Sequence, residues 1–179
     1  MKRLVFALLC LAGLGLPASV GAAELKVGDP APDFTLAATD GRTYKLSDFK
    51  GKQAVVIAWF PAAFTQGCTI ECKSLAANGE KIRKFDVSYF MASVDPIEGE
   101  KGSKAFAEAY DADFPMLSDS SKQVAEMYGV LGQSGRASRW TFYVDKNGRI
   151  AAIDKQVRPP TSAEDMLAKL GELKVDARR

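Results

Sequence analysis

Residues 54–60, which read Ala-Val-Val-Ile-Ala-Trp-Phe, form an uninterrupted apolar run with polar residues on either side. A run of this length without alternation is typical of a strand that is covered on both faces. From about residue 67 to residue 85, apolar side chains recur at helical spacing, at Leu75, Ile82 and Phe85. A buried strand that leads directly into a helix indicates an α/β fold.

Other runs and turn signals continue this pattern along the chain. Asp40-Gly41 predicts a β-hairpin over residues 33–46, and Asn147-Gly148 predicts a second hairpin near the end of the chain. We expect Asn78-Gly79 to kink or divide the first helix. The other expected elements are strands at 87–94, 115–117, 140–144 and 150–153, helices at 101–110 and 122–128, the second capped by Ser120-Ser121, and a last helix that begins at the capping box Thr161-Ser162-Ala163-Glu164.

The first 23 residues have the pattern of a secretory signal peptide. A basic start at residues 1–3 precedes an uncharged apolar run at 4–16 and small, turn-prone residues at 17–23. An uncleaved membrane anchor is the alternative, and lipidation at Cys10 is disfavoured because a large residue, Leu9, precedes it. We therefore expect a signal peptide at residues 1–23, one domain at residues 24–179, and an exported, periplasmic protein that leaves the membrane once the signal is cleaved.

The charge of the mature chain argues against nucleic-acid binding. Removal of residues 1–23 takes away Lys2 and Arg3 and no acidic residue, so the formal charge falls from +2 to zero. A neutral chain without a block of Lys and Arg has no electrostatic footprint for nucleic acid. Cys10 leaves with the signal, so Cys68 and Cys72 are the cysteines of the mature chain, in a compartment that is expected to be oxidising.

The sequence contains no histidine. This excludes a Cys-His or Ser-His pair within the chain, and two thiols are too few for a structural zinc site. We therefore predict no metal and no cofactor. Any cysteine chemistry has to activate its thiol without an imidazole, which leaves a helix dipole and arginine as the means.

Residues 60–72 carry both of these cysteines at the junction between the apolar strand and the helix. A thiol at a helix start lies near unpaired backbone N–H groups, and the positive end of the helix dipole favours its thiolate. Cys68 is therefore the candidate nucleophile, and we expect its sulfur to be open to solvent. Thr65, three residues earlier, can hydrogen-bond the sulfur or the molecule that the sulfur attacks. Its alternative role is that of a turn or cap residue.

Pro61, Thr65 and Cys68 stand in a Pro-x3-Thr-x2-Cys pattern that resembles the active-site loop of the peroxiredoxins. Thr69, Glu71 and the nearby second cysteine are similar to the peroxiredoxin Q branch, also called bacterioferritin comigratory protein. In that branch the second cysteine usually lies five residues after the first, whereas Cys72 lies four after Cys68. The resemblance covers nearly all of residues 25–173 and implies a thioredoxin-like fold, with a central mixed sheet, flanking helices and the N-terminal β-hairpin.

The same resemblance implies the remaining site residues. Arg139, just before Trp140-Thr141-Phe142, matches the arginine that stabilises the thiolate and the leaving oxygen; otherwise it is a surface arginine like its neighbour Arg136. Glu71 would orient Arg139 through a charge-assisted pair, or would only be a favourable carboxylate in the first turn of the helix. Pro61 would shield the thiolate from water, or would only end the strand.

The implied activity is that of a thiol-dependent peroxidase for hydrogen peroxide or organic hydroperoxides. Cys68 would become a sulfenic acid, and Cys72 would resolve it as an intramolecular disulfide that a thioredoxin-like protein reduces. Cβ atoms four residues apart on a helix are about 5–6 Å apart, farther than the ~3.8 Å of a disulfide. We therefore expect residues 64–75 to be remodelled in the oxidised form. The sequence leaves open whether the protein is a monomer or a homodimer.

Two other function classes remain open at this point. An exported thioredoxin-like disulfide oxidoreductase would share the fold, the compartment and the pair of cysteines. Its cysteines would normally have Cys-x-x-Cys spacing, whereas Cys68 and Cys72 are separated by three residues. In a non-catalytic binding module with a structural disulfide, the positions of Thr65 and Arg139 would be coincidences.

Overall fold

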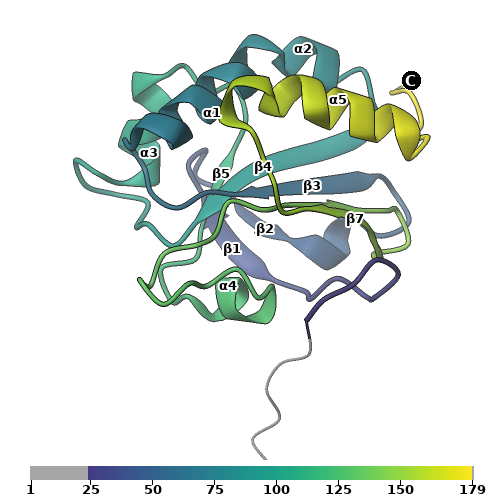
Figure 1. The fold of residues 1–179 in the computed structure, drawn as a ribbon, viewed down its shortest axis with the longest axis horizontal. Coiled ribbons are helices and arrows are strands. Elements are labelled where there is room, and N and C mark those ends of the chain that lie inside the picture. Colours follow the sequence, from purple (N-terminus) through teal and green to yellow (C-terminus); the bar gives the residue numbers. More distant parts are fainter. Residues whose placement is uncertain (1–23, 179) are drawn as a thin grey trace, which may run out of the picture.

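The computed structural model describes residues 24–178, so the predicted signal peptide at residues 1–23 lies outside the described residues. Seven strands form one sheet in the order β2-β1-β5-β4-β3-β6-β7 (Figure 1). The strands are β1 (Thr35–Ala38), β2 (Thr43–Lys45), β3 (Ala54–Trp59), β4 (Val87–Ser93), β5 (Met116–Ser118), β6 (Thr141–Val144) and β7 (Ile150–Asp154). The helices are α1 (Gln66–Ala77), α2 (Gly79–Ile82), α3 (Ser103–Ala109), α4 (Gln123–Met127) and α5 (Ser162–Glu172).

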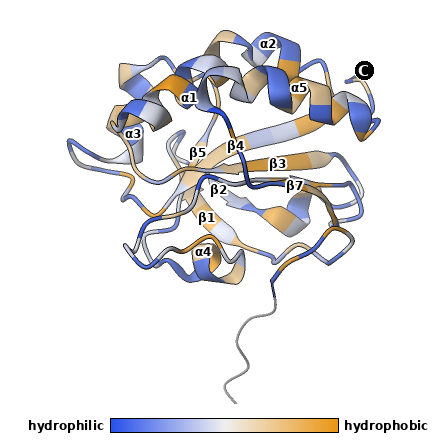
Figure 2. Ribbon diagram, in the orientation of Figure 1, coloured by the Kyte–Doolittle hydropathy of each residue, from blue (hydrophilic) through white to orange (hydrophobic). Residues whose placement is uncertain are grey.

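Strand β3 lies at the centre of the fold and is buried on both faces, as its apolar sequence predicts. All six of its residues are buried, and alternate side chains enter two different cores. Val56 packs with α1, α2 and α5 on one face, whereas Ile57 packs with α4 and the N-terminal strands on the other. Figure 2 shows β3 as a hydrophobic strand between the helical layers. This confirms the predicted α/β class.

The sheet is mixed, and its pairing sets the positions of the strand ends. β3, β4 and β5 are parallel neighbours, while β1 pairs antiparallel with β2 and β5, and β6 pairs antiparallel with β3 and β7. The carboxyl ends of β3 and β4 therefore share one edge of the sheet. The antiparallel pairing brings the start of β6 to the same edge. Helix α1 begins just beyond the end of β3 (Figure 1).

The structure divides the first helix where expected and corrects one of the two predicted caps. Asn78 separates α1 from α2. In place of a capping box, the hydroxyl of Thr161 donates to the Asp165 carboxylate. The reason is that a 3-10 turn at Pro159–Thr161 runs directly into α5. At the start of α4 the hydroxyl of Ser121 accepts the Gln123 N–H at 3.4 Å, as predicted, and the Asp119 carboxylate accepts the Ala125 N–H at 2.7 Å.

Within residues 24–178, none of the helices combines the length and the apolar character that a membrane crossing needs. The longest helix described, α1, has 12 residues and includes charged side chains. A bilayer-spanning helix needs about 20 predominantly apolar residues.

Candidate active site

Cys68 occupies the third position of α1, at the carboxyl edge of the sheet. Thr65 is the N-cap residue in an extended conformation, and its carbonyl accepts the Thr69 N–H at 2.9 Å. The N–H groups of residues 66–68 precede this first bond of the helix, so they lack partners within α1. The sulfur therefore lies in the first turn, where the helix dipole favours negative charge.

Arg139 reaches this helix start from the neighbouring strand. The backbone N–H of Trp59 donates to the Trp140 carbonyl at 2.9 Å. This bond fixes Arg139, the residue before Trp140, beside the end of β3. The Arg139 Nη2 donates to the Cys68 Sγ at 3.2 Å, and its Nη1 donates to the Glu71 carboxylate in an ion pair. The structure thus brings together the three residues that the resemblance placed in one site.

The chain makes room for this arginine at Gly67. A Cβ atom at Gly67 would lie 3.1 Å from the Arg139 Nη2 and 3.8 Å from the Pro159 ring. Contacts of about 3.1 Å are tighter than carbon and nitrogen atoms normally keep, so a larger residue would displace the guanidinium. The other arginine of the loop, Arg136, is exposed.

The charges of the site are set by burial and by the ion pair. Burial raises the pKa of Glu71 to about 7, although Arg139 opposes this shift. Burial lowers the pKa of Arg139, but the interactions with Glu71 and Cys68 outweigh this effect and raise the pKa overall. The guanidinium therefore stays charged. Glu71 is only 1% exposed and lies in the second turn of α1, so its predicted alternative role as a first-turn carboxylate is wrong.

Cys68 itself is fully buried, with 0% of the residue exposed. The expectation of an open thiol is therefore wrong for this conformation. The sulfur packs against the core below it, and Arg139 covers it with a side chain that is 18% exposed. A molecule from solvent can reach the sulfur only after the side chains that cover it shift.

Thr65 lies beside the site without touching the sulfur in this conformation. Its Oγ1 donates to the Ala62 carbonyl at 3.0 Å, and no hydrogen bond to Cys68 is found among the described residues. Because the hydroxyl proton is used, the Thr65 oxygen is left as an acceptor for the O–H of a bound molecule. Pro61 is half-buried at the end of β3, next to the same loop.

Cys72 lies one turn after Cys68 in the same intact helix, and both are free thiols. Cys72 is also fully buried. Burial and then the charges of Glu71 and Cys68 raise the pKa of Cys72 to about 12. In this conformation Cys72 is therefore a protonated core residue, and any reaction between the two sulfurs needs a local opening of α1.

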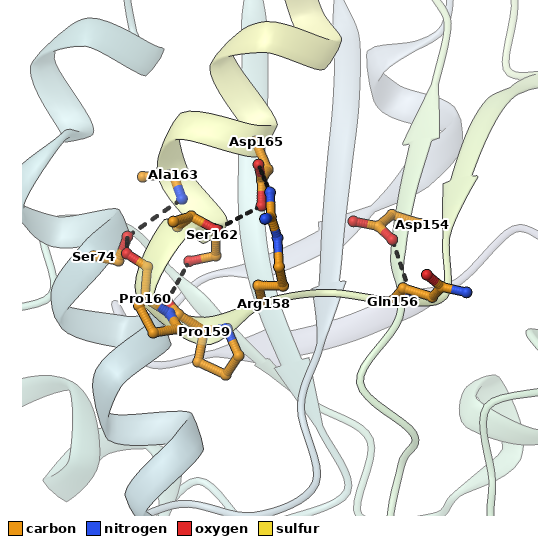
Figure 3. A network of polar contacts seen from close by, with 10 residues as sticks. Ser74, Asp154, Gln156, Arg158, Pro159, Pro160, Ser162, Ala163 and Asp165 are labelled. Carbon is orange, nitrogen blue, oxygen red and sulfur yellow. Dashed lines mark hydrogen bonds and ion pairs between the residues drawn. The ribbon is translucent and has the colours of Figure 1, made fainter.

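The segment between β7 and α5 packs along α1 (Figure 3). The Ser74 hydroxyl accepts the Ala163 N–H at 3.3 Å and donates to the Pro160 carbonyl at 3.4 Å. Arg158 donates to Asp165 at 2.8 Å and ties the segment to α5. The sequence did not predict this contact, because Ser74 is 86 residues from Pro160 and belongs to no recognisable motif.

Sequence reasoning also missed Asp95, which binds the loop that carries Pro61 and Thr65. The carboxylate follows β4 and accepts the Ala63 N–H at 2.8 Å. A signal was present, because polar residues that follow neighbouring parallel strands meet at one edge of the sheet. As for metals, residues 24–178 contain no cluster of three or more Cys, Asp or Glu side chains arranged to hold an ion.

Comparisons with known proteins identify the family of the chain. A family model described as "AhpC/TSA family" matches residues 27–153. The peroxiredoxin Bcp of Escherichia coli K12 is 37% identical over 136 residues, which cover 72% of this chain and 85% of that protein. The chloroplastic peroxiredoxin Q of Sedum lineare is 34% identical over 155 residues, 85% of this chain and 81% of that protein.

The crystal structure of peroxidoxin BcpB from Mycobacterium tuberculosis superimposes with a TM-score of 0.74 at 29% identity, covering 83% of this chain and 98% of that one. This likeness confirms the predicted thioredoxin-like fold, a mixed sheet with flanking helices. Both the fold and the sequence thus match over most of the domain. The chain belongs to the AhpC/TSA family, and it is a thiol peroxidase of the peroxiredoxin type.

Proposed function

We propose that Cys68 is the peroxidatic cysteine and that the protein reduces hydrogen peroxide or organic hydroperoxides through it. The observation that carries this proposal is the Arg139 guanidinium, which donates to the Cys68 sulfur and to Glu71 at once. A fixed cation at the sulfur favours the thiolate and can also stabilise the oxygen that leaves with negative charge. Cys68 is the cysteine that Arg139 touches.

In the first step the Cys68 thiolate attacks one oxygen of the hydroperoxide. An S–O bond forms as the O–O bond breaks, and the other oxygen leaves as hydroxide or alkoxide and takes up a proton. The cysteine becomes a sulfenic acid, so sulfur is oxidised and the peroxide is reduced. Thr65 would accept a hydrogen bond from the peroxide O–H, since its own proton is donated to Ala62.

In the second step Cys72 attacks the Cys68 sulfenic acid, and an S–S bond forms as water leaves. The intact α1 keeps Cys72 buried and protonated, so residues 64–75 have to open first. An external dithiol of the thioredoxin-like type would then reduce the disulfide. This role for Cys72 rests on its position, since it is the other cysteine of residues 24–178.

The test measures peroxide consumption with dithiothreitol for wild type, Cys68→Ser and Cys72→Ser, beside an insulin-reduction assay. We expect Cys68→Ser to lose peroxide consumption and insulin to remain unreduced. Peptide mapping after one equivalent of peroxide should find the Cys68–Cys72 disulfide. A free Cys72 beside a sulfinic Cys68 would remove the resolving role, and peroxide consumption that persists in Cys68→Ser would remove the proposal itself.

We propose further that residues 1–23 direct the protein out of the cytoplasm, to the periplasm of a bacterial host. The support is the basic start, the apolar run and the small residues before position 24. N-terminal sequencing of the protein from a periplasmic extract tests this. A mature N-terminus at residue 23 or 24 is the expected result, whereas an intact N-terminus in the cytoplasmic fraction would contradict it.

A further inference from the structure

The loop between β3 and α1 depends on contacts from outside for its conformation. Phe64 has a φ of +60°, in the left-handed region that side-chain-bearing residues rarely adopt. Its ring packs against Phe106 and Tyr110, with centroids 5.2 and 6.2 Å away. Among residues 24–178, the side chain that accepts a backbone N–H of residues 61–64 is Asp95, which binds Ala63.

Asp95 is itself held firmly by two serines of the neighbouring strands. Its Oδ2, which accepts the Ala63 N–H, also accepts the Ser93 hydroxyl at 3.1 Å, and the Asp95 N–H donates back to Ser93 at 3.1 Å. The Ser118 hydroxyl donates to the Asp95 carbonyl at 2.6 Å. Ser93 is fully buried. The carboxylate is thus a fixed point of the sheet edge.

A continuous chain of hydrogen bonds leads from this fixed point to the proposed peroxide site. The Ala63 N–H and the Ala62 carbonyl belong to the same peptide group. The N–H side of this group donates to Asp95, and the carbonyl side accepts the Thr65 hydroxyl at 3.0 Å. Because the peptide group is planar, holding its N–H also fixes the direction of its carbonyl. Hydrogen bonds in such a chain also polarise one another.

We propose that Asp95 is a positioning residue for peroxide reduction, which acts through the Ala62–Ala63 peptide to aim the Thr65 hydroxyl. The inference rests on the proposed role of Cys68 and deepens it. Without the Asp95 bond, the peptide group can rotate, and the Thr65 oxygen loses the orientation in which it accepts the O–H of the peroxide. Misplacement of a group in a reacting site slows the reaction even when the group itself is present.

The test is a double-mutant cycle on the single-turnover rate of Cys68 oxidation, followed by the fluorescence of Trp59 and Trp140. Asp95→Ala is expected to slow oxidation about 10-fold, because one positioning hydrogen bond is lost. Asp95→Asn should stay within about 2-fold of wild type, since an amide oxygen can accept both bonds. In a Thr65→Val background, Asp95→Ala should cost less than about 2-fold more, because the two residues act as one unit.

Asp119→Ala is the matched control. Asp119 follows β5 as Asp95 follows β4, and it likewise accepts a backbone N–H and a serine hydroxyl, from Ala125 and Ser121, at 2.7 and 2.8 Å. Within the described part of the chain, its carboxylate makes no hydrogen bond to residues 61–65. We expect it to lower stability and leave the rate per folded molecule unchanged. Ser93→Ala is a smaller change, which removes a hydrogen bond that holds Asp95. It replaces Asp95→Ala in the test if that variant does not fold, and it should slow oxidation about 3-fold.

Three results would overturn the positioning role alone. These are an Asp95→Ala or Ser93→Ala protein as fast as wild type, an Asp95→Asn protein as slow as Asp95→Ala, and an Asp95→Ala effect of full size in the Thr65→Val background. Failure of the proposed function looks different, because wild type would then consume no peroxide or would do so without Cys68. That outcome would overturn this inference together with the proposed function.

Discussion

Replacement of Arg139 by methionine removes the positive charge that lies beside the Cys68 sulfur, so it isolates the contribution of that charge. The Nη2–Sγ distance is 3.2 Å. At that separation Coulomb's law with an effective dielectric constant of about 20 gives a gross attraction of about 5 kcal/mol for the thiolate. Glu71 and the loss of hydration offset part of it, so the net value of a hydrogen bond to a charged group, about 1.5–3 kcal/mol, is the better guide. We expect oxidation to slow about 10- to 150-fold.

The same substitution also removes the partner of a buried carboxylate. Glu71 is 1% exposed and Arg139 opposes the rise of its pKa to about 7, so without the guanidinium this carboxyl takes up a proton at neutral pH, and the loss is that of a hydrogen bond to a charged group, about 1.5–3 kcal/mol of stability. The double variant Arg139→Met with Glu71→Gln replaces this carboxyl by an amide that stays uncharged at every pH, so it should be as slow as the single variant. Arg136→Met is the matched control, because Arg136 lies three residues earlier, is exposed and makes no side-chain hydrogen bond to the site within residues 24–178.

The assay is single-turnover oxidation at neutral pH, with stability measured separately by urea unfolding. The prediction requires a slow Arg139→Met, an equally slow double variant and an Arg136→Met protein that matches wild type. An Arg139→Met protein within about 2-fold of wild type would refute the reasoning, because the guanidinium would then contribute too little to the thiolate or to the leaving oxygen. A double variant that regains the rate would show that only the unpaired Glu71 had slowed the reaction.

Three further predictions concern Glu71, Cys72 and Ser74. The folded-state pKa of Glu71 is raised from 4.5 to about 7, so the folded protein holds this proton more tightly than the unfolded chain. Relative to Glu71→Gln, wild type should lose up to about 3 kcal/mol of unfolding free energy as the pH rises from about 5 to about 8. Urea unfolding at both pH values measures this, and a relative gain with pH would contradict it. With its pKa raised to about 12, reduced Cys72 should react with iodoacetamide at least about 100-fold more slowly in native protein than in urea; equal labelling rates would disprove its burial. Ser74→Ala should cost about 1 kcal/mol of stability and speed formation of the disulfide, because α1 is then less firmly held. Slower disulfide formation would show that Ser74 helps the opening.

Much of the secondary structure was predictable because its signals are local. The apolar run of β3 identifies a strand buried on both faces, and Asn78-Gly79 marks the division between α1 and α2. The four-residue spacing of Cys68 and Cys72 places both in one helix. The cap at Ser121 was predictable for the same reason, whereas the capping box at Thr161 was not, because the 3-10 turn that precedes α5 turns the Thr161 hydroxyl to Asp165.

The sequence by itself determined an α/β chain whose nucleophile candidate lies at a helix start and whose chemistry excludes histidine. The resemblance implied that Arg139 meets that sulfur, but only the tertiary structure shows how it does so. Arg139 is 71 residues from Cys68 and reaches it because β6 runs antiparallel to β3 and begins where β3 ends. The burial of Cys68 and the Asp95 bond to Ala63 were likewise set by packing at the sheet edge. Such contacts depend on strand order and on the space left by neighbouring side chains, and a local pattern in the sequence fixes neither.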